Sequence, residues 1–217
     1  MKKCLIIANG AAPAKSIITF LKKKGYDHVI CADGGANIAL RNSINPEVII
    51  GDLDSILPST LEHYKDTFEI IKIARQSDTD LEKALKYAIQ KKFTACILLS
   101  VIGDRLDHSF SNLSIAIRFS DKIDIGIISG RSFLRVLGGR QVLKTKKDEI
   151  ISFYGIDEKT TITATGLKYK IHNTNLPFGK KESTSNCATD ETVGLEITNG
   201  KIFVIRDYPN MRKNDLF

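Results

Sequence analysis

The chain has 217 residues, of which 42% are hydrophobic and 26% are charged, and its formal net charge is +7, an ordinary balance for a globular protein. No apolar run approaches the roughly 20 residues that span a bilayer, and the apolar stretch after the basic start is too short for a signal peptide, so we expect a cytoplasmic protein without a membrane segment. The lysines are spread along the chain, which argues against nucleic-acid binding, and the four cysteines form no C-x-x-C pair, which argues against disulfides and zinc.

Residues 3 to 129 alternate short β-branched runs with helical patterns. The predicted strands are "KCLIIAN", "HVICAD", "PEVIIGD", "FEIIKI", "TACILLSV" and "IDIGIIS". Continuous apolar runs of this kind are typical of a parallel sheet covered on both faces. Helices are predicted in "PAKSIITFLKKKG", in "SDTDLEKALKYAIQKK", where Thr79 and Glu82 have capping-box spacing, and in "HSFSNLSIAIRFSD", with Leu113, Ala116 and Ile117 on its buried face. Residues 1–130 are therefore predicted to form a doubly wound, mostly parallel α/β domain.

After about residue 130 the helical period disappears. Short runs such as "FLRVL", "QVLKT", "EIISFYG" and "TTITATG" are separated by turn residues, and no helix is expected. The segment "VGLEITNGKIFVIRD" predicts a hairpin, because Asn199 and Gly200 could supply the two positive-φ residues of a type I′ turn. Residues 131–217 are therefore predicted to form a smaller all-β, sandwich-like domain.

Polar residues follow four successive predicted strands. They are "DGGAN" at 33–37, "GDLDS" at 51–55, "ARQSDTD" ending at residue 80, and "GDRLDHSFSN" at 103–112. Each segment alone could be a turn, a helix start or a solvated surface. Unrelated turns, however, would not be expected to place acidic residues repeatedly at the same edge of a sheet. Because ligands of open α/β sheets bind beyond the carboxyl ends of the strands, this edge is the predicted site.

The carboxylates at this edge are the candidate metal ligands, namely Asp52, Asp54, Asp78 and Asp80. Two such charges about 4 Å apart repel by roughly 4 kcal/mol at an effective dielectric near 20, so they require either water or a cation. Carboxylate oxygens suit Mg²⁺, which commonly shares its ligands with phosphates. Gly34 and Gly35 would let backbone N–H groups approach phosphate oxygens, and Arg105 offers a planar fork for a phosphate. The pattern predicts a metal–nucleotide site, although neither the P-loop motif nor G-x-G-x-x-G is present.

At these residues the chain resembles the thiamine pyrophosphokinase family over nearly its whole length. The motifs "ADGGAN", "GDLDS", the D-x-D of "QSDTDLEKAL", "GDRLDHSFSN", "FYG", "ATGLKY" and "STSN" stand in the family's order and spacing. The resemblance implies transfer of the pyrophosphoryl group of ATP to the hydroxyl of thiamine, giving thiamine diphosphate and AMP, with Mg²⁺ as cofactor. One departure is Asp104, where the family commonly has a second glycine.

The resemblance also implies a role for each motif. The implied catalytic residues are Asp52, Asp54, Asp80 and Arg105. The implied nucleotide-binding residues are Asp33, Gly34, Gly35, Asn37, Gly103, Arg105, Asp107, His108 and Asn112. The implied thiamine-binding residues are Gln76, Ser183, Ser185 and Asn186. In the family, thiamine lies between the α/β domain of one subunit and the β domain of the other, which implies a homodimer with shared sites.

Three other functions fit parts of the pattern. A pyrophosphokinase acting on a hydroxymethylpterin would need only a different acceptor pocket. A nucleotide-sugar transferase also uses a D-x-D pair on a metal, which Asp52 and Asp54 would satisfy. A nonenzymatic sensor would bind ATP without turnover. The chain has no tryptophan, so the sequence leaves open which aromatic surface faces the thiamine rings.

Overall fold

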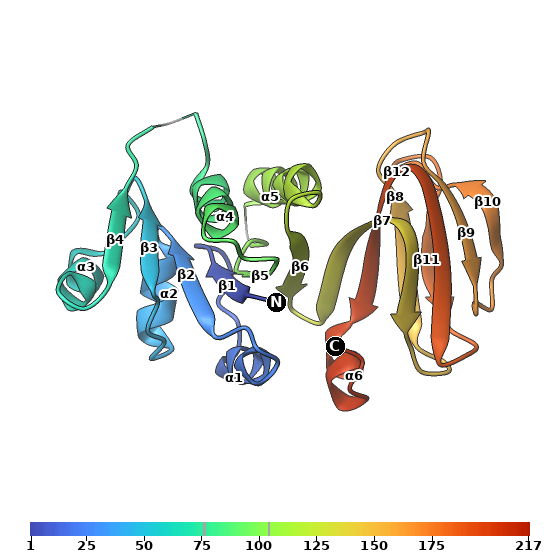
Figure 1. The fold of residues 1–217 in the computed structure, drawn as a ribbon, viewed down its shortest axis with the longest axis horizontal. Helices are drawn as coiled ribbons and strands as arrows, with labels where there is room; N and C mark the ends of the chain where they lie inside the picture. Colours follow the sequence, from blue (N-terminus) through green and yellow to red (C-terminus); the bar gives the residue numbers. More distant parts are fainter. Residues whose placement is uncertain (76, 104) are drawn as a thin grey trace. The chain divides into compact units, whose positions relative to one another are not determined.

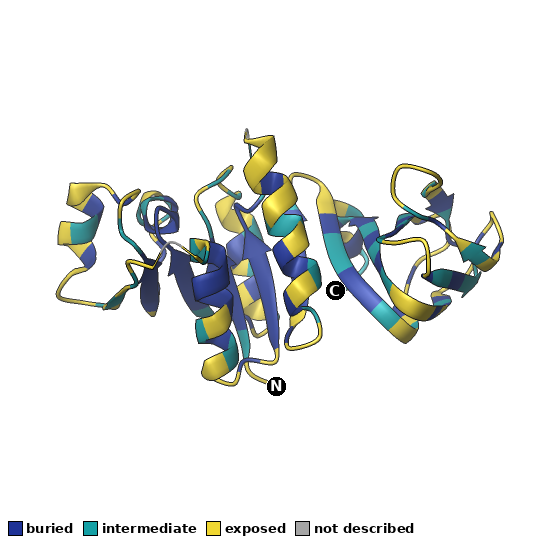
Figure 2. Ribbon diagram, turned by 90° about the horizontal axis from the view of Figure 1, so that it is seen from above, coloured by how far each residue is buried: buried dark blue, intermediate teal, exposed yellow. Residues whose placement is uncertain are grey.

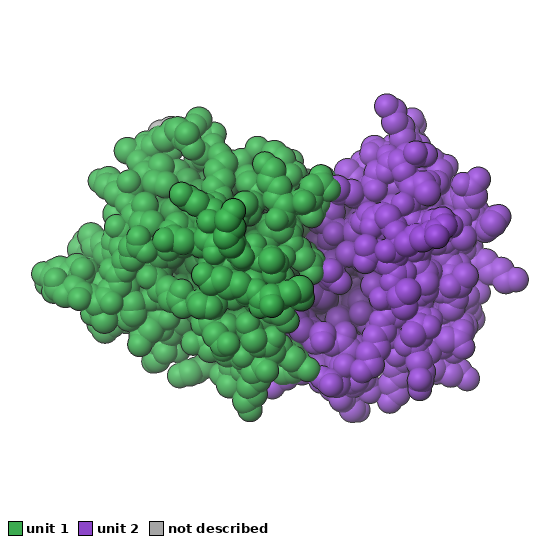
Figure 3. Space-filling model, viewed as in Figure 1, with its two compact units in different colours: residues 1–130 green, residues 131–217 purple. Residues whose placement is uncertain are grey.

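The computed structural model describes residues 1–75, 77–103 and 105–217. Two residues singled out in the sequence, Gln76 as a thiamine contact and Asp104 as the departure from the family pattern, lie outside these ranges. The chain divides into two compact units, residues 1–130 and residues 131–217, which Figure 3 colours separately. Within the described ranges, no helix is both long and apolar enough to cross a membrane.

The first unit is built on a parallel sheet with the strand order β6-β5-β1-β2-β3-β4 (Figure 1). Its strands are β1 (Lys3–Ile7), β2 (His28–Ala32), β3 (Val48–Gly51), β4 (Glu69–Lys72), β5 (Ala95–Leu99) and β6 (Asp124–Ser129). Every pairing between them is parallel. The central strands are buried because helices cover the sheet (Figure 2). This confirms the predicted α/β class.

The helices of this unit are α1 (Lys15–Lys23), α2 (Gly35–Arg41), α3 (Pro58–Tyr64), α4 (Asp80–Gln90) and α5 (Leu106–Phe119). The predicted capping box at the start of α4 is confirmed, because the Thr79 hydroxyl accepts from the Glu82 amide and the Glu82 carboxylate accepts from the Thr79 amide. The buried face of α5 differs from the prediction. Ile115, Ala116 and Phe119 are buried there, whereas Leu113 and Ile117 are only half-buried.

The order of the strands creates a switch point between β1 and β5. The chain builds β1 to β4 outward in one direction, then returns through α4 to place β5 on the other side of β1. Helices α4 and α5 lie on one face of the sheet, and α1 and α2 lie on the other (Figure 1). In such sheets the loops diverge at the switch point and open a crevice at the carboxyl edge.

The second unit is antiparallel throughout its strands. These are β7 (Ser132–Lys144), β8 (Ile150–Gly155), β9 (Thr161–Thr165), β10 (Ile171–Asn175), β11 (Ser183–Cys187) and β12 (Thr192–Asp207). Their inward-facing apolar side chains, such as Phe153 and Ile202, form one core. The expectation of no helix is wrong at the end of the chain, where α6 (Tyr208–Lys213) begins. The Asp207 carboxylate caps this helix by accepting from the Asn210 amide at 2.8 Å.

The predicted hairpin at Asn199 and Gly200 is wrong, because both residues lie within the single strand β12. Asn199 does have a positive φ of 61°, but Gly200 does not, and the register shift between Ile197 and Lys201 marks a bulge. Strand β7 pairs with β12 on both sides of the bulge, while β9 pairs with its first half and β8 with its second. The two halves of this one strand therefore have different partners on the side away from β7. Gly200 is needed for another reason, since a Cβ there would lie 2.0 Å from the Thr160 hydroxyl.

Candidate active site

A cavity of about 540 Å³ opens at the carboxyl edge of the parallel sheet. The loops after β1, β2, β3, β4 and β5 line it, together with the first turns of α4 and α5. Four of the strand ends predicted from the sequence therefore meet around one space or its rim. The loop after β1, with Asn9 and Gly10, also lines the cavity but was not predicted. The rule that ligands bind beyond the carboxyl ends of the strands also applies to the first strand, so it would have predicted this loop.

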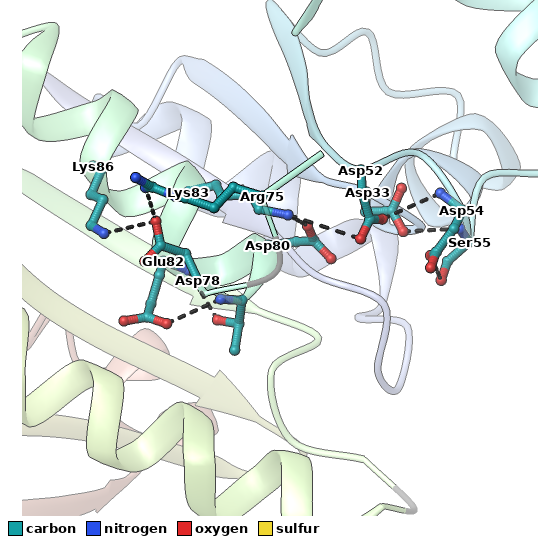
Figure 4. Close-up of polar contacts among 11 residues, drawn as sticks. Asp33, Asp52, Asp54, Ser55, Arg75, Asp78, Asp80, Glu82, Lys83 and Lys86 are labelled. Carbon is teal, nitrogen blue, oxygen red and sulfur yellow. Dashed lines mark hydrogen bonds and ion pairs between the residues drawn. The ribbon is translucent and has the colours of Figure 1, made fainter. Parts of the chain in front are cut away.

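Three carboxylates converge on this cavity. One oxygen from each of Asp33, Asp52 and Asp80 lies within 4.8 Å of the other two (Figure 4). Asp33 is only 3% exposed, and its Oδ1 has no hydrogen-bond partner among the described residues. Burial, and to a smaller extent the nearby Asp80, raises the pKa of Asp33. A buried carboxylate with an unpaired oxygen is costly without a cation, so the cluster is suited to bind one.

The backbone around these acids adopts conformations that are unfavourable for L-residues. Asp33 has a φ of 42° and Leu53, between Asp52 and Asp54, has a φ of 68°. The two loops also approach closely, since a Cβ at Gly51 would lie 2.7 Å from the Asp33 Cβ. The Asp33 carboxylate accepts from the Ser55 amide at 3.1 Å, which joins the loop after β2 to the loop after β3. Strained backbone of this kind gathers at functional sites, where the surrounding structure holds it in place.

A buried lysine completes the acidic cluster. The side chain of Lys83 is 2% exposed, and its ammonium lies 2.8 Å from an Asp80 oxygen and 4.0 Å from an Asp52 oxygen (Figure 4). Lys83 lines the cavity and follows Asp80 by one turn of α4. Sequence reasoning missed this residue, although its spacing of three from an acid at the start of a predicted helix was visible.

Two of the predicted metal ligands lie outside the cluster. The Asp78 carboxylate is ion-paired with Arg75 and, at 2.9 Å, with Lys86. The hydrogen bond from Lys86, followed by that from Arg75, lowers the pKa of Asp78. Asp54 is exposed, and its carboxylate accepts from the Ser55 hydroxyl at 2.9 Å. The cluster therefore consists of Asp33, Asp52 and Asp80. The sequence pattern had indicated Asp52 and Asp80 as well, but with Asp54 and Asp78 in place of Asp33.

Several of the predicted nucleotide-binding residues hold the loops of the site in position. The Asn37 side chain donates to the Ser55 carbonyl at 2.9 Å and accepts from the Leu57 amide at 3.0 Å, so it clamps the loop that carries Asp52. Gly34 and Gly35 are required for close packing under this site. A Cβ at Gly35 would lie 2.0 Å from the Ile7 carbonyl, and one at Gly34 would lie 2.5 Å from the Asn9 side chain.

The start of α5 forms the other side of the cavity, where Arg105 and His108 line it. The exposed Arg105 guanidinium lies 2.6 Å from Asp107 and lowers the pKa of that carboxyl to about 2. The Asn112 side chain donates to the Val101 carbonyl at 2.7 Å and thereby fixes the loop after β5. Gly103 lies against the loop after β1, since a Cβ there would be 3.3 Å from the Gly10 Cα.

In the second unit, the predicted thiamine-binding motif surrounds an exposed tyrosine. Asn186 is 1% exposed, and its amide donates to the Tyr169 carbonyl and the Ser183 hydroxyl and accepts from the Tyr169 and Cys187 amides. These four bonds use the whole capacity of a side-chain amide. Ser185 is exposed at a φ of 57°, and the Tyr169 ring is 61% exposed. Asn186 therefore positions the segment that presents Tyr169.

Comparisons with known proteins identify the family. A family model described as "Thiamin pyrophosphokinase, catalytic domain" matches residues 21–128, and one described as "Thiamin pyrophosphokinase, vitamin B1 binding domain" matches residues 140–202. Thiamine pyrophosphokinase 3 of Oryza sativa subsp. japonica is 30% identical over 199 residues, which cover 78% of this chain and 74% of that protein.

Solved structures show the same fold. The thiamin pyrophosphokinase of Candida albicans superimposes with a TM-score of 0.82 at 18% identity, covering 94% of this chain and 88% of that one. The thiamine pyrophosphokinase of Bacillus subtilis gives a TM-score of 0.81 at 23% identity, covering 95% and 99%. Because both family models match in succession and the relative at 30% identity extends over most of both chains, this protein is a member of the thiamine pyrophosphokinase family.

Proposed function

We propose that this protein transfers the pyrophosphoryl group of ATP to the hydroxyl of thiamine, giving thiamine diphosphate and AMP. The observation that carries the proposal is the cluster of Asp33, Asp52 and Asp80 beside a cavity at the carboxyl edge of the sheet, within the region that matches the family's catalytic domain. The family favours thiamine over a hydroxymethylpterin or a nucleotide sugar as the partner of this site.

The acidic cluster fits Mg²⁺ by the chemistry of its donors. All three residues offer hard carboxylate oxygens, and the Asp33 Oδ1 is buried without a partner in the described chain. Asp33, Asp52 and Asp80 are therefore the proposed ligands, and Asp54 is close enough in sequence to join them when substrate binds. When bound, Mg²⁺ would neutralise phosphate charge and orient the phosphates for attack.

Other side chains of the cavity supply positive charge for the phosphates and hold the loops of the site in place. Lys83 holds Asp80 and Asp52 in their observed arrangement and places a buried positive charge beside the phosphates. Arg105 offers a guanidinium for the nucleotide phosphates, and its two hydrogen bonds to Asp107 orient that guanidinium. Asn37 and Asn112 keep the loops after β3 and β5 in place. Catalysis in this arrangement rests mainly on positioning and on neutralising charge.

The second unit is the proposed thiamine-binding part. Tyr169 presents an exposed aromatic side chain, the Lys168 ammonium lies 5.6 Å from the centre of its ring, and Asn186 fixes its backbone on both sides. An aromatic face attracts a cationic ring such as the thiazolium of thiamine. We propose that Tyr169 takes this role in a chain that lacks tryptophan, with Ser183 and Ser185 beside it. A homodimer in which each site combines the acids of one chain with Tyr169 of the other is part of the proposal.

Product analysis tests the reaction. The purified protein is incubated with ATP, Mg²⁺ and thiamine, and the products are followed by phosphorus NMR and chromatography. We expect AMP and thiamine diphosphate in equal amounts without ADP. Stoichiometric ADP with thiamine monophosphate would contradict attack on the β-phosphorus. Parallel reactions with a hydroxymethylpterin and with a labelled nucleotide sugar test the other acceptor and donor classes, and ATP binding without turnover of any acceptor would indicate a sensor.

A further inference from the structure

Ser100 combines two unfavourable features at the wall of the cavity. It follows β5, it is 5% exposed, and its φ is 58°, a value that favours glycine over serine. Its hydroxyl has no hydrogen-bond partner in the part of the chain that the structure describes. An unpaired buried hydroxyl costs stability, and so does a positive φ at a residue with a Cβ. Glycine would remove both costs, so the serine indicates a use for the hydroxyl.

The position of Ser100 indicates what that use is. Its carbonyl accepts from the Gly10 amide at 2.7 Å, so it joins the loops after β5 and β1 at the switch point of the sheet. Ser100 lines the same cavity as Asp33, whose Oδ1 is the other buried unpaired oxygen of this unit among the described residues. The acids lie at the ends of β2 and β3 and at the start of α4, whereas Ser100 follows β5, in the loop that leads to Arg105 and His108 at the start of α5.

We propose that the Ser100 hydroxyl binds the AMP part of the nucleotide. This inference rests on the proposed function, in which the acids serve the transferred pyrophosphoryl group and the AMP part must extend away from them. The bond between the Ser100 carbonyl and Gly10 fixes the backbone, and rotation about χ1 turns the hydroxyl among its staggered positions toward a phosphate or sugar oxygen. Serine donates and accepts equally well, so it suits either oxygen.

The substitution Ser100→Gly tests this role, and Ser43→Gly is its matched control. Ser43 is an exposed serine with a φ of 55° that does not line this cavity, so the same change there reports the effect of the backbone alone. Binding of AMP and of adenosine to the full chain is measured by calorimetry without metal or thiamine. We expect Ser100→Gly to bind AMP about tenfold more weakly, as for the loss of one hydrogen bond, with an unfolding midpoint equal to or above that of the wild type.

The outcomes separate the possible roles. A loss for AMP alone places the hydroxyl on the phosphate, and a loss for both ligands places it on the nucleoside; either supports the proposal. Unchanged AMP affinity in Ser100→Gly, an equal loss in Ser43→Gly, a matching fall in the unfolding midpoint, or a wild-type chain that does not bind AMP would overturn it. Because binding is measured without turnover, a failure to form thiamine diphosphate would contradict the proposed function and leave this result intact.

Discussion

The substitution Asp80→Asn should abolish catalysis while leaving the fold intact. The Asp80 carboxylate attracts the Lys83 ammonium at 2.8 Å, which is worth about 6 kcal/mol at an effective dielectric of 20. It is also repelled by Asp33 and Asp52, whose nearest oxygens lie within 4.8 Å, so each repulsion is worth at least about 3.5 kcal/mol at the same dielectric. The repulsions together at least offset the attraction, so removing the charge should not lower the free energy of unfolding by more than about 1 kcal/mol. The unfolding midpoint then falls by no more than about 2–4 °C.

Activity should respond very differently, because Asp80→Asn removes one of three proposed metal ligands. We expect kcat/KM to fall by at least about a hundredfold and Mn²⁺ affinity to fall with it. Binding of Mn²⁺ alone is followed by electron paramagnetic resonance, since the chain has no tryptophan to report it by fluorescence. Thermal unfolding of the same samples measures stability.

Asp78→Asn is the matched control, because the same change is made two residues before Asp80, in the loop that leads into α4. Its carboxylate is engaged by Arg75 and Lys86 and lies outside the cluster. We expect near-normal turnover and Mn²⁺ binding with a small decrease in stability. If Asp78→Asn lost as much activity and metal affinity as Asp80→Asn, the assignment of the three-carboxylate cluster would be refuted.

Further predictions concern pH, the second unit and the assembly. The lowered pKa of Asp78 stabilises the fold above the carboxyl's ordinary value of 3.8, and this contribution is lost as the pH falls through the lowered pKa. The difference in unfolding midpoint between wild type and Asp78→Asn should therefore be full at neutral pH and shrink below 3.8; a constant difference would contradict the ion pairs. Asn186→Ala should cost roughly 2–3 kcal/mol in a denaturant titration, because it leaves the backbone of Tyr169 unpaired. Tyr169→Leu should raise KM for thiamine about three- to tenfold with an unchanged KM for ATP, and an unchanged KM for thiamine would remove Tyr169 from the site. For the proposed homodimer, Asp80→Asn and Tyr169→Ala chains mixed at limiting thiamine should recover about a quarter of wild-type activity as subunits exchange. A site built within one chain would gain no activity as subunits exchange, once exchange has been verified by mass labelling.

Local signals in the sequence were sufficient for the class of the fold and for the edge that carries the site. Continuous apolar runs predict buried parallel strands wherever they occur, and the capping box at Thr79 starts α4 through contacts three residues apart. The acids at the ends of β2 and β3 and at the start of α4 then meet because parallel strands end at one edge. The location of the cavity was therefore predictable without coordinates.

Local signals failed where a distant partner competed with them. Asn199 and Gly200 have the composition of a tight turn, yet β12 continues because β7 pairs with both of its halves, and these pairings outweigh a two-residue preference. Asn186 has the composition of a polar loop residue, but its side chain makes two hydrogen bonds with the Tyr169 backbone and two with Ser183 and Cys187. The sequence shows which residues favour a turn and which side chains are polar. Which strand or backbone group each of them pairs with depends on how the whole sheet is assembled.

The same distinction applies to the chemistry of the site. The sequence by itself determined that carboxylates gather at one edge, because the strand ends are set by local runs of apolar residues. Only the tertiary structure decided which carboxylates converge, since Asp33 joins Asp52 through the close packing of Gly51 while the Asp78 carboxylate is held by Lys86. Only the fold places the Lys83 ammonium near both Asp80 and Asp52, because α4 packs against β2 and β3 and buries that side chain. Electrostatic energies depend on distance and burial, and both are properties of the packed chain.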